Sequence, residues 1–216
     1  DRQNISLTNE EYDTVRFLKK YAKKLIVLVY AGSAVDLNLI DELADAIVLV
    51  GYGGQCSSQA VSNIICGNVS PSGRLSETYP KALTDIPSTH SYMDEKIMKY
   101  EEKENIGYRY FTSSNVSELY PFGYGLSYAK FSYLNFNVKK EGNEVMVEVD
   151  VLNNSSIEAK EVVQLYCYRL DTTNRPKKEL KAFTKINLKP NEKQTVKFVL
   201  KERDFFDFDP ITKIWT

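Results

Sequence analysis

Two short apolar runs rich in Val, Ile and Leu constrain the fold of this chain more than any other feature. They are LIVLVY at residues 25–30 and AIVLVGY at residues 46–52. Unbroken runs of this kind are typical of strands that are buried on both faces, as parallel strands are. Between them, VDLNLIDELADA places Leu37, Ile40 and Leu43 on one helical face. Strand, helix and strand at this spacing predict a parallel sheet with right-handed crossovers.

Two further helices are expected beside these strands. Residues 8–24 begin with Thr8 and carry Glu11 three places later, which is the reciprocal capping pair of a helix start. The second helix, SSQAVSNIIC, follows the second strand and precedes Gly67, a residue that can end a helix in a left-handed conformation. A turn-rich stretch, GNVSPSGRL, then closes the α/β half of the chain.

The composition of the sequence changes between residues 80 and 120, where Pro, Ser, Tyr and charged residues of both signs are scattered with little periodicity. An irregular segment of this length tends to be functional or to cross between domains. It leads into PFGYGLSYAKFSY at residues 121–133, where a proline, glycines and aromatic residues indicate a stiff joint. We therefore interpret this region as a linker and a hinge.

The C-terminal half has the pattern of an all-β domain. NEVMVEVDVLN alternates with the period of two that is typical of a strand with one wet face. One face would carry Val145, Val147, Val149 and Val151, and the other Met146, Glu148 and Asp150. Two more runs, VVQLYCYRL and TVKFVLKERDF, are set off by turn signals. Several short strands at such spacing predict an antiparallel sandwich.

Charge and composition exclude several classes of partner. With 28 Lys and Arg against 29 Asp and Glu, the net charge is −1, so we expect neither nucleic acid nor an anionic membrane surface as a partner. The apolar runs are far too short to cross a bilayer. The three cysteines lack a C-x-x-C spacing, and we interpret them as small buried apolar residues. The N-terminal residues match no secretory signal, so localisation stays open.

The chain shows no complete catalytic set. His90 stands among Ser, Thr and Tyr without a positioned partner, and neither Ser33 nor Ser72 lies in G-x-S-x-G. GYGGQ falls short of a dinucleotide fingerprint because Cys56 stands where the third glycine would be. YEEKE at residues 100–104 carries carboxylates suited to acid/base work, but such runs are more often a solvated face.

The order of several motifs nevertheless resembles a known family. These motifs are DR before a helix start, IVLVYAGSAVD, AIVLVGYGGQ, GNVSPSGRLSETYP, IGYRYF, LYPFGYGLSYAKFSY and AKEVVQLY…RPKKELKAFTKINLKPNE. PSGRL before GYRYF before PFGYGLSY is the specific part of this order. The chain resembles the C-terminal portion of a glycoside hydrolase family 3 enzyme of the β-glucosidase type.

This resemblance implies a fold and a domain order. The fold would be α/β, a portion of a parallel-sheet α/β sandwich, followed by an all-β immunoglobulin-like or fibronectin type III-like sandwich. The α/β part would span residues 1–90, the linker and hinge residues 91–127, and the sandwich residues 128–216. FFDFDPITKIWT matches the segment before the last sandwich strand of the family, so an unpaired sheet edge is expected.

The resemblance also implies roles for individual residues. The family's acid/base glutamate stands in E-G-x-D-R and would fall three residues before Asp1, while its aspartate nucleophile belongs to a (β/α)8 barrel. We therefore expect no catalytic residue in this chain and a barrel domain from the same or another chain as its partner. Asp1 and Arg2 would anchor the acid/base loop, and Tyr52, Tyr100 and Glu101 would line the rim of the pocket. The substrate would be a β-linked glucoside or oligosaccharide, with no metal and no organic cofactor.

Some departures from the family pattern leave alternatives open. Gly51 replaces an aromatic residue, QCSSQ replaces an acidic and glycine-rich run, and Ser76 stands in place of a proline. A non-catalytic interaction or scaffold protein is therefore the alternative hypothesis. A third is a small nucleotide-binding α/β protein with an appended sandwich.

Overall fold

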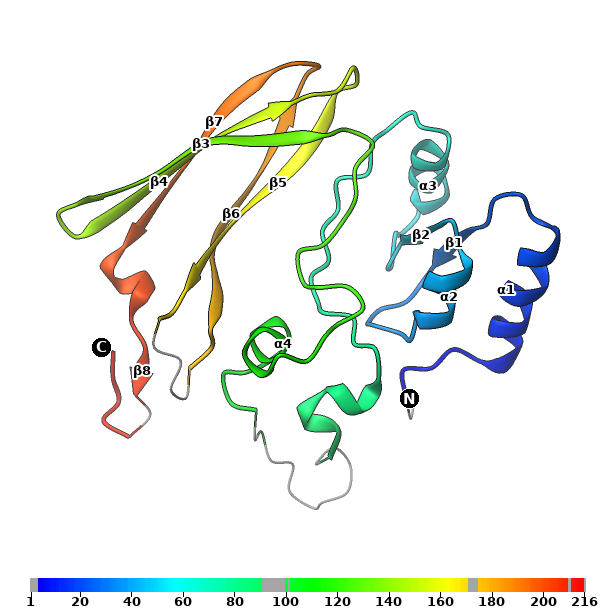
Figure 1. Cartoon of the computed structure of the whole chain (residues 1–216), viewed down its shortest axis with the longest axis horizontal. Coiled ribbons are helices and arrows are strands. Elements are labelled where there is room, and N and C mark those ends of the chain that lie inside the picture. Colours follow the sequence, from blue (N-terminus) through cyan, green and yellow to red (C-terminus); the bar gives the residue numbers. More distant parts are fainter. Residues whose placement is uncertain (1–3, 91–99, 101, 171–174, 210, 216) are drawn as a thin grey trace. The chain divides into compact units, whose positions relative to one another are not determined.

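The computed structural model describes residues 4–90, 100, 102–170, 175–209 and 211–215 (Figure 1). The chain divides into two compact units that exchange segments. Unit 1 comprises Asp1–Asn68, Arg74–Gly125 and Tyr168–Lys178, and unit 2 comprises Val69–Gly73, Leu126–Cys167 and Glu179–Thr216. The domain limits expected from the sequence stay predictions.

Unit 1 begins with alternating helices and strands, as the sequence predicted. These elements are α1 (Asn9–Tyr21), β1 (Ile26–Val29), α2 (Asn38–Leu43), β2 (Ala46–Leu49) and α3 (Ser57–Ile65). β1 and β2 pair in parallel, in a register that runs from Ile26 opposite Ala46 to Val29 opposite Leu49. The predicted β-α-β arrangement is therefore confirmed.

The predicted helix signals are also present. The Glu11 backbone N–H donates to Thr8 Oγ1 at 3.2 Å, and the Thr8 N–H donates to Glu11 Oε2 at 2.8 Å. This capping box satisfies amides at the start of α1 that have no partner within the helix. Behind α3, Gly67 has a φ of +77°, the left-handed conformation that glycine adopts at little cost.

The core of unit 1 lies on one face of the two-stranded sheet. α1 and α2 pack there, against Val27 and Val29, and the buried core residues are Val15, Leu25, Val35, Leu37, Ile40 and Tyr79. α3 lies near Leu28, on the face away from α1, and its Val61 is buried. The expectation that β1 is buried on both faces is wrong, because Ile26 and Leu28 are 45% and 37% exposed. Burial of the second face would need more cover than the described residues provide.

Where the structure describes residues 80–120, that is, outside residues 91–99 and 101, this segment contains short helices. They are the 3₁₀ turns η1 (Leu83–Asp85) and η2 (Pro87–His90) and the helix α4 (Tyr108–Ser114). The irregular texture predicted for residues 80–120 agrees with this observation.

Unit 2 is built from antiparallel strands in two sheets. β3 (Phe131–Glu141), β4 (Glu144–Asn153) and β7 (Lys193–Lys201) form one sheet in the order β3-β4-β7, while β5 (Ala159–Tyr168) pairs with β6 (Lys178–Leu188). A turn, η3 (Glu202–Phe205), leads to the small hairpin of β8 (Phe208–Asp209) and β9 (Ile214–Trp215). Among the described strands β5 pairs only with β6. The expectation of an edge left by a missing last strand stays a prediction.

The core of unit 2 follows the predicted alternation, with one exception. Val149 and Val151 of β4 pack with Val163, Ile186, Leu188 and Val196. Asp150, expected on the wet face, is only 9% exposed. Its carboxylate accepts hydrogen bonds from Thr195 Oγ1 at 2.6 Å, Asn135 Nδ2 at 2.9 Å and Lys193 Nζ at 3.1 Å. The charge is therefore paired, which is how buried carboxylates are tolerated.

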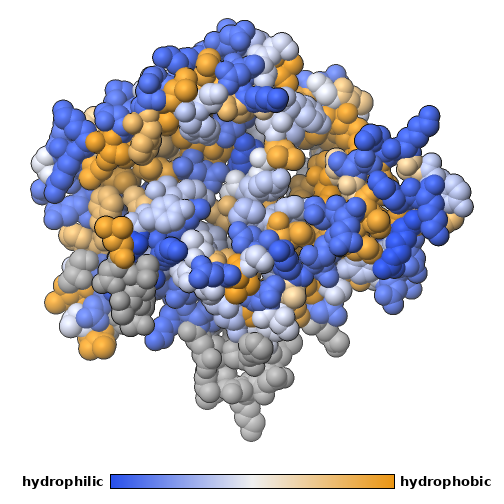
Figure 2. Space-filling view, in the orientation of Figure 1, coloured by the Kyte–Doolittle hydropathy of each residue, from blue (hydrophilic) through white to orange (hydrophobic). Residues whose placement is uncertain are grey.

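Two surface features complete the fold. Apolar residues reach the surface over the strands of unit 2 (Figure 2), and Phe136 and Phe183 are 66% and 68% exposed. The interpretation of the cysteines as buried is wrong, because Cys56 and Cys66 are exposed and Cys167 is partly exposed. The two exposed thiols lie at the ends of the short helix α3, where few other elements cover them.

Candidate functional site

A pocket lies at the carboxyl ends of the two parallel strands, where ligands of open α/β sheets usually bind. Its volume is about 240 Å³. It is lined by Val29, Ala31, Gly32, Leu49, Val50, Gly51, Arg74, Leu75, Ser76, Glu77 and Tyr79. Three segments contribute: the turn after β1, the turn after β2, and a stretch that reaches the same edge of the sheet from residues 74–79.

One wall of the pocket depends on a close approach between two turns. Gly51 follows β2 with a φ of +62°, and this left-handed residue turns the chain toward Tyr52. A Cβ atom on Gly32 would lie 2.5 Å from Tyr52 Oη and 2.6 Å from Cε2 of the same ring. A larger residue at position 32 would therefore displace this ring. The other side of Tyr52 is open, since the residue is 87% exposed.

The third segment is held in place by pairing with the hinge motif. Tyr79 N–H donates to the Tyr120 carbonyl at 2.9 Å, and Leu119 N–H donates to the Tyr79 carbonyl at 2.9 Å. Nearer the pocket, Leu75 N–H donates to the Tyr124 carbonyl at 2.8 Å. Residues 74–79, which begin with the last two residues of PSGRL, thus pair with residues 119–124 within unit 1.

Stacked tyrosines support this pairing. The rings of Tyr120 and Tyr124 are 5.6 Å apart and nearly parallel, and Tyr79 lies 6.1 Å from Tyr120. The Tyr120 hydroxyl donates a hydrogen bond to the Asp41 carboxylate of α2. Burial, together with this bond to a negative charge, raises the pKa of Tyr120 well above its usual range. The phenol stays protonated and serves as a fixed donor.

The polar groups of the pocket suit hydrogen bonding to an uncharged, hydroxyl-rich ligand. Arg74 provides donors, Ser76 both donates and accepts, and Glu77 provides acceptors. Burial, and secondarily the charge of Glu77, raises the pKa of the neighbouring Tyr79. Among the lining residues Glu77 is the single carboxylate, so the pocket lacks the second acid that two-carboxylate hydrolysis needs.

The residues predicted from the sequence are only partly brought together. Tyr52 is not among the residues that line the pocket, but its ring lies next to Gly32, which does line it. Tyr100 is 72% exposed and is not among the residues that line the pocket. Asp1, Arg2 and Glu101 lie outside the described residues.

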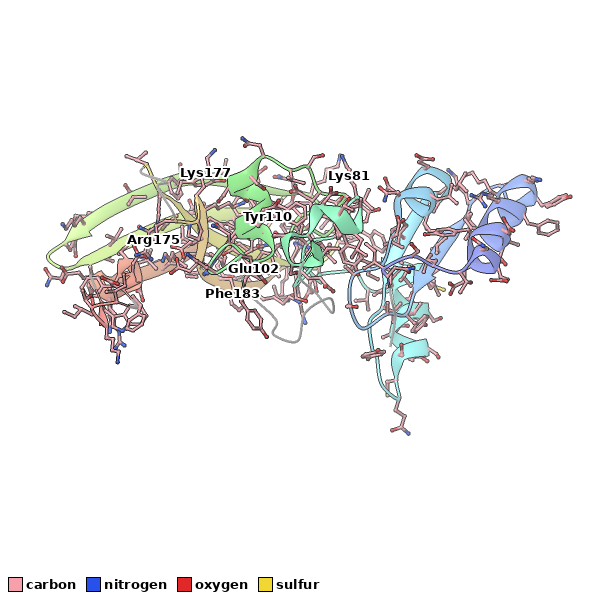
Figure 3. The ribbon with its side chains drawn as sticks, turned by 90° about the horizontal axis from the view of Figure 1, so that it is seen from below. Lys81, Glu102, Tyr110, Arg175, Lys177 and Phe183 are labelled. Atoms are coloured by element: carbon pink, nitrogen blue, oxygen red, sulfur yellow. The ribbon has the colours of Figure 1, made fainter. Side chains whose placement is uncertain are left out.

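The charged run at residues 100–104 takes part in an ion pair. Arg175, labelled in Figure 3, lies on the loop between β5 and β6 and donates to the carboxylate of Glu104 at 3.2 Å. Lys177 on the same loop donates its N–H to Ser113 Oγ of α4 at 3.0 Å. Glu104 is therefore an ion-pair partner, and the interpretation of this run as a solvated face stays a prediction. Glu102 Oε2 is buried and has no hydrogen-bond partner among the described residues.

Sequence reasoning missed Gly32, Arg74 and Glu77 as lining residues. The sequence could have pointed to these residues, because Gly32 follows a predicted strand and the other two lie within the motif GNVSPSGRLSETYP. The parts of the chain that the structure describes contain no cluster of three or more His, Cys, Asp or Glu side chains suited to a metal ion. None of the described helices is both long enough and apolar enough to span a membrane.

Two family models match the chain. The model for "Glycosyl hydrolase family 3 C-terminal domain" matches residues 1–128. The model for "Fibronectin type III-like domain" matches residues 161–216. The first covers the α/β elements and the hinge motif, and the second covers most of the sandwich strands after β4.

Curated relatives are similar along the whole chain. Thermostable beta-glucosidase B of Acetivibrio thermocellus is 35% identical over 222 residues, which cover 100% of this chain and 29% of the relative. Beta-glucosidase BoGH3A of Bacteroides ovatus is 33% identical over 225 residues, which cover 100% of this chain and 30% of the relative. The chain thus spans less than a third of the length of these relatives.

Solved structures agree with the sequence comparison. The GH3 beta-glucosidase of Bifidobacterium adolescentis superposes with a TM-score of 0.94 at 33% identity, covering 100% of this chain and 32% of that one. The beta-glucosidase of Kluyveromyces marxianus in complex with glucose gives a TM-score of 0.93 at 32% identity, covering 100% of this chain and 26% of that one.

Proposed function

Because the chain belongs to glycoside hydrolase family 3, we propose that it works as the C-terminal module of a retaining β-glycosidase of the β-glucosidase type. The substrate is a terminal β-linked glucoside or oligosaccharide. The observation that carries this proposal is similarity at 35% and 33% identity to two beta-glucosidases along the entire chain. The catalytic acid/base and nucleophile come from polypeptide outside these 216 residues.

The partner of the module is a (β/α)8 barrel, on the same or another chain. Two features support this assignment. The chain covers less than a third of its relatives, so most of their length lies elsewhere. The pocket at the strand ends has one carboxylate, Glu77, whereas retaining hydrolysis needs two carboxyl groups about 5 Å apart. A reacting pair must therefore be assembled with groups that another polypeptide segment brings.

The module contributes a wall of the sugar site and stabilises the enzyme. Tyr52 is suited to this role because its ring lies against Gly32 on one side and is open on the other. Arg74 and Glu77 are suited to hydrogen bonds with sugar hydroxyls. Asp1 and Arg2 would anchor the acid/base loop, while Tyr100 and Glu101 would complete the rim.

A chimeric enzyme tests the proposal. The 216 residues are fused behind the part of the A. thermocellus β-glucosidase that precedes its matched region. We expect the chimera to hydrolyse 4-nitrophenyl β-glucoside and the isolated chain to leave it intact. The control is the truncated relative with an unrelated sandwich domain at its C-terminus. A folded but inactive chimera would favour the scaffold hypothesis, and hydrolysis by the isolated chain would contradict the proposed division of catalytic groups.

A further inference from the structure

Three residues just before β6 are docked onto unit 1, and we call them the clamp: Arg175, Pro176 and Lys177. Arg175 donates to both carboxylate oxygens of Glu104, at 3.2 and 3.3 Å. The side chain of Pro176 is fully buried. Lys177 donates its backbone N–H to Ser113 Oγ of α4 at 3.0 Å. The clamp therefore clusters with unit 1, although it lies between two sandwich strands in the sequence.

The clamp contacts a turn whose own conformation is unfavourable. Lys103 has a φ of +50°, a left-handed conformation that costs free energy in any residue with a Cβ atom. The Asn105 N–H donates to the Glu102 carbonyl at 2.8 Å and closes the turn. Inside it, Glu102 Oε2 and Asn105 Oδ1 are buried and have no hydrogen-bond partner among the described residues. Because strain and unpaired acceptors both favour other conformations, the turn depends on contacts from outside.

The same turn adjoins a residue proposed for the rim of the sugar site. The Tyr100 carbonyl accepts the Lys103 N–H at 3.3 Å, and the side of Tyr100 away from the turn is open, since the residue is 72% exposed. On the other side of the turn, α4 is anchored by its buried Phe111. The turn thus connects an anchored helix to an exposed rim residue, and Glu104 is the point at which the clamp contacts it.

The ion pair acts through its place in the chain more than through its strength. Its side chains are 29% exposed at Arg175 and 48% exposed at Glu104, and pairs this open to water add little to the stability of a whole domain. The residues next to Arg175 are already fixed, because Pro176 is buried and Lys177 is bonded to α4. The guanidinium therefore reaches the Glu104 carboxylate with little further loss of chain freedom.

From these contacts we propose that Arg175 is a positioning residue of the glycosidase. Through Glu104 it holds the turn at residues 102–105 and so determines where Tyr100 and Glu101 meet the substrate. Loss of the ion pair weakens sugar binding and spares the chemical step, because the catalytic groups come from outside these 216 residues. The inference rests on the proposed function in taking Tyr100 and Glu101 as part of the rim.

Charge reversal in the chimeric enzyme tests the inference. Glu104→Arg places two guanidinium groups opposite each other, and Arg175→Glu places two carboxylates there. Each should raise the KM for 4-nitrophenyl β-glucoside about threefold or more and change kcat by less than about twofold, because binding is weakened and chemistry is not. The double variant restores an ion pair of opposite sense and should return KM to within about twofold of the parent.

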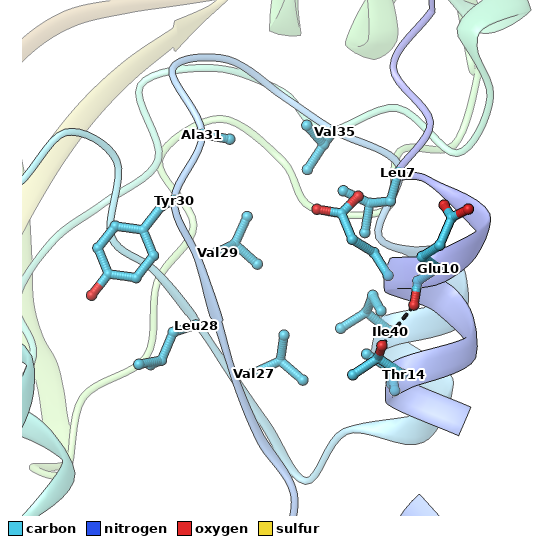
Figure 4. Close-up of a pocket in the computed structure, with 12 residues that line it drawn as sticks. Leu7, Glu10, Thr14, Val27, Leu28, Val29, Tyr30, Ala31, Val35 and Ile40 are labelled. Carbon is cyan, nitrogen blue, oxygen red and sulfur yellow. Dashed lines mark hydrogen bonds between the residues drawn. The ribbon is translucent and has the colours of Figure 1, made fainter. Parts of the chain in front are cut away.

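A matched control reverses the charge in an ion pair elsewhere in unit 1. Asp13 pairs with Arg16 at 2.8 Å on α1, the helix that carries Glu10 and Thr14 in Figure 4. Asp13→Arg makes the same change of charge opposite an arginine. It should leave both KM and kcat within about twofold of the parent.

Amide hydrogen exchange of the 216-residue chain gives a readout that needs no activity. Glu104→Arg should speed exchange over residues 102–107 by about two- to fivefold, the size expected when one partly exposed ion pair is lost. Asp13→Arg should leave exchange over these residues unchanged. Exchange over Ile26–Val29 of β1 should stay the same in both variants, which shows that unit 1 remains folded. If it rises in Glu104→Arg, Arg175→Glu takes the place of that variant.

The remaining outcomes separate this inference from the proposed function. Equal effects of Glu104→Arg and Asp13→Arg on KM, a loss confined to kcat, or a double variant no better than the single ones would overturn the role of Arg175. Faster exchange with an unchanged KM would overturn it as well, because the turn would then move without consequence for the substrate. An inactive parent chimera with faster exchange would contradict the function and keep the clamp, and an active one with unchanged exchange would do the reverse.

Discussion

Replacement of Asn153 should be among the most damaging polar substitutions in unit 2. Asn153 ends β4 and is 0% exposed. Its Nδ2 group donates to the carbonyls of Ile157 at 2.8 Å, Leu188 at 3.1 Å and Lys189 at 3.2 Å. Its Oδ1 atom accepts the Ser155 N–H at 3.0 Å. Because Leu188 belongs to β6, this one amide joins the two sheets.

The size of the effect follows from the groups left without partners. Asn153→Ala removes the donor of three carbonyls and the acceptor of one N–H group. A fully buried unsatisfied group costs about 1–3 kcal/mol, and the groups that water can reach cost less. We therefore expect the free energy of unfolding to fall by about 3 kcal/mol, a large part of the total of about 5–15 kcal/mol typical of a domain.

Asn153→Asp should be worse still at neutral pH, because a carboxylate would face three carbonyl oxygens. Burial would raise the pKa of the introduced acid in the folded state, while the unfolded value stays near about 3.9. When the pKa of an acid is higher in the folded than in the unfolded state, the free energy of unfolding falls as pH rises above the unfolded pKa. The free energy of unfolding of Asn153→Asp should therefore fall further and further below that of Asn153→Ala between about pH 4 and pH 8.

Urea unfolding measures these differences. The chain has one tryptophan, Trp215, which lies in unit 2 at 5.4 Å from Phe208, so its fluorescence reports on this unit. Asn154→Ala is the control, because Asn154 is the exposed neighbour and should cost less than about 1 kcal/mol. An Asn153→Ala protein within about 0.5 kcal/mol of the parent would refute the reasoning.

Three further predictions concern other contacts. Gly32→Ala should displace the Tyr52 ring, since its Cβ would lie 2.5 Å from Oη, and should raise the KM of the chimera for 4-nitrophenyl β-glucoside more than it lowers kcat; an unchanged KM would exclude Tyr52 from the sugar site. Tyr120→Phe and Asp41→Asn, combined in a double-mutant cycle of unfolding, should give a coupling energy of about 1–3 kcal/mol, and additive effects would contradict the bond between them. Hydrogen bonds from Thr195 first, then from Asn135 and Lys193, lower the pKa of Asp150 to about 2. Its contribution to the free energy of unfolding is therefore complete above the unfolded pKa of about 3.9 and fades as pH falls through about 2. The free energy of unfolding of Asp150→Asn should lack this loss in acid, and an equal pH dependence of the variant and the parent would disprove the prediction.

Local signals made the secondary structure predictable. The capping pair Thr8 and Glu11 acts within a single helical turn, and the alternation of Val147, Val149 and Val151 is a property of the strand itself. The chain order of strands and helices then determined a parallel sheet. Residues close in sequence were sufficient for each of these inferences.

Burial that depends on distant segments could not be read in the same way. Val and Leu runs predict an inner strand, but they do not reveal whether its neighbours are present, so the exposed face of β1 went unforeseen. Asp150 has the polar character of a wet position and is buried by partners on other strands, including Thr195 and Lys193. Such partners are separated from it by more than forty residues of sequence.

The sequence allowed a prediction of candidate site residues only where they lie in the turn that directly follows a predicted strand. Tyr52 lies in the turn after β2, which ends at Leu49, and its position at a carboxyl edge could be inferred. Arg74 and Glu77 reach the pocket because the segment around them pairs with residues 119–124. The sequence displays both stretches but not their hydrogen bonds.

The exchange of segments between the two units limits how this chain can be divided. Residues 69–73 cluster with the sandwich, although they precede the hinge motif, and residues 168–178 cluster with the α/β unit, although they lie between two sandwich strands. No single cleavage point therefore separates the units with each left whole. A fragment cloned from the hinge motif onward would lack residues 69–73 of unit 2 and would keep residues 168–178 without the rest of unit 1. In evolution, recombination that preserves both units must transfer them together.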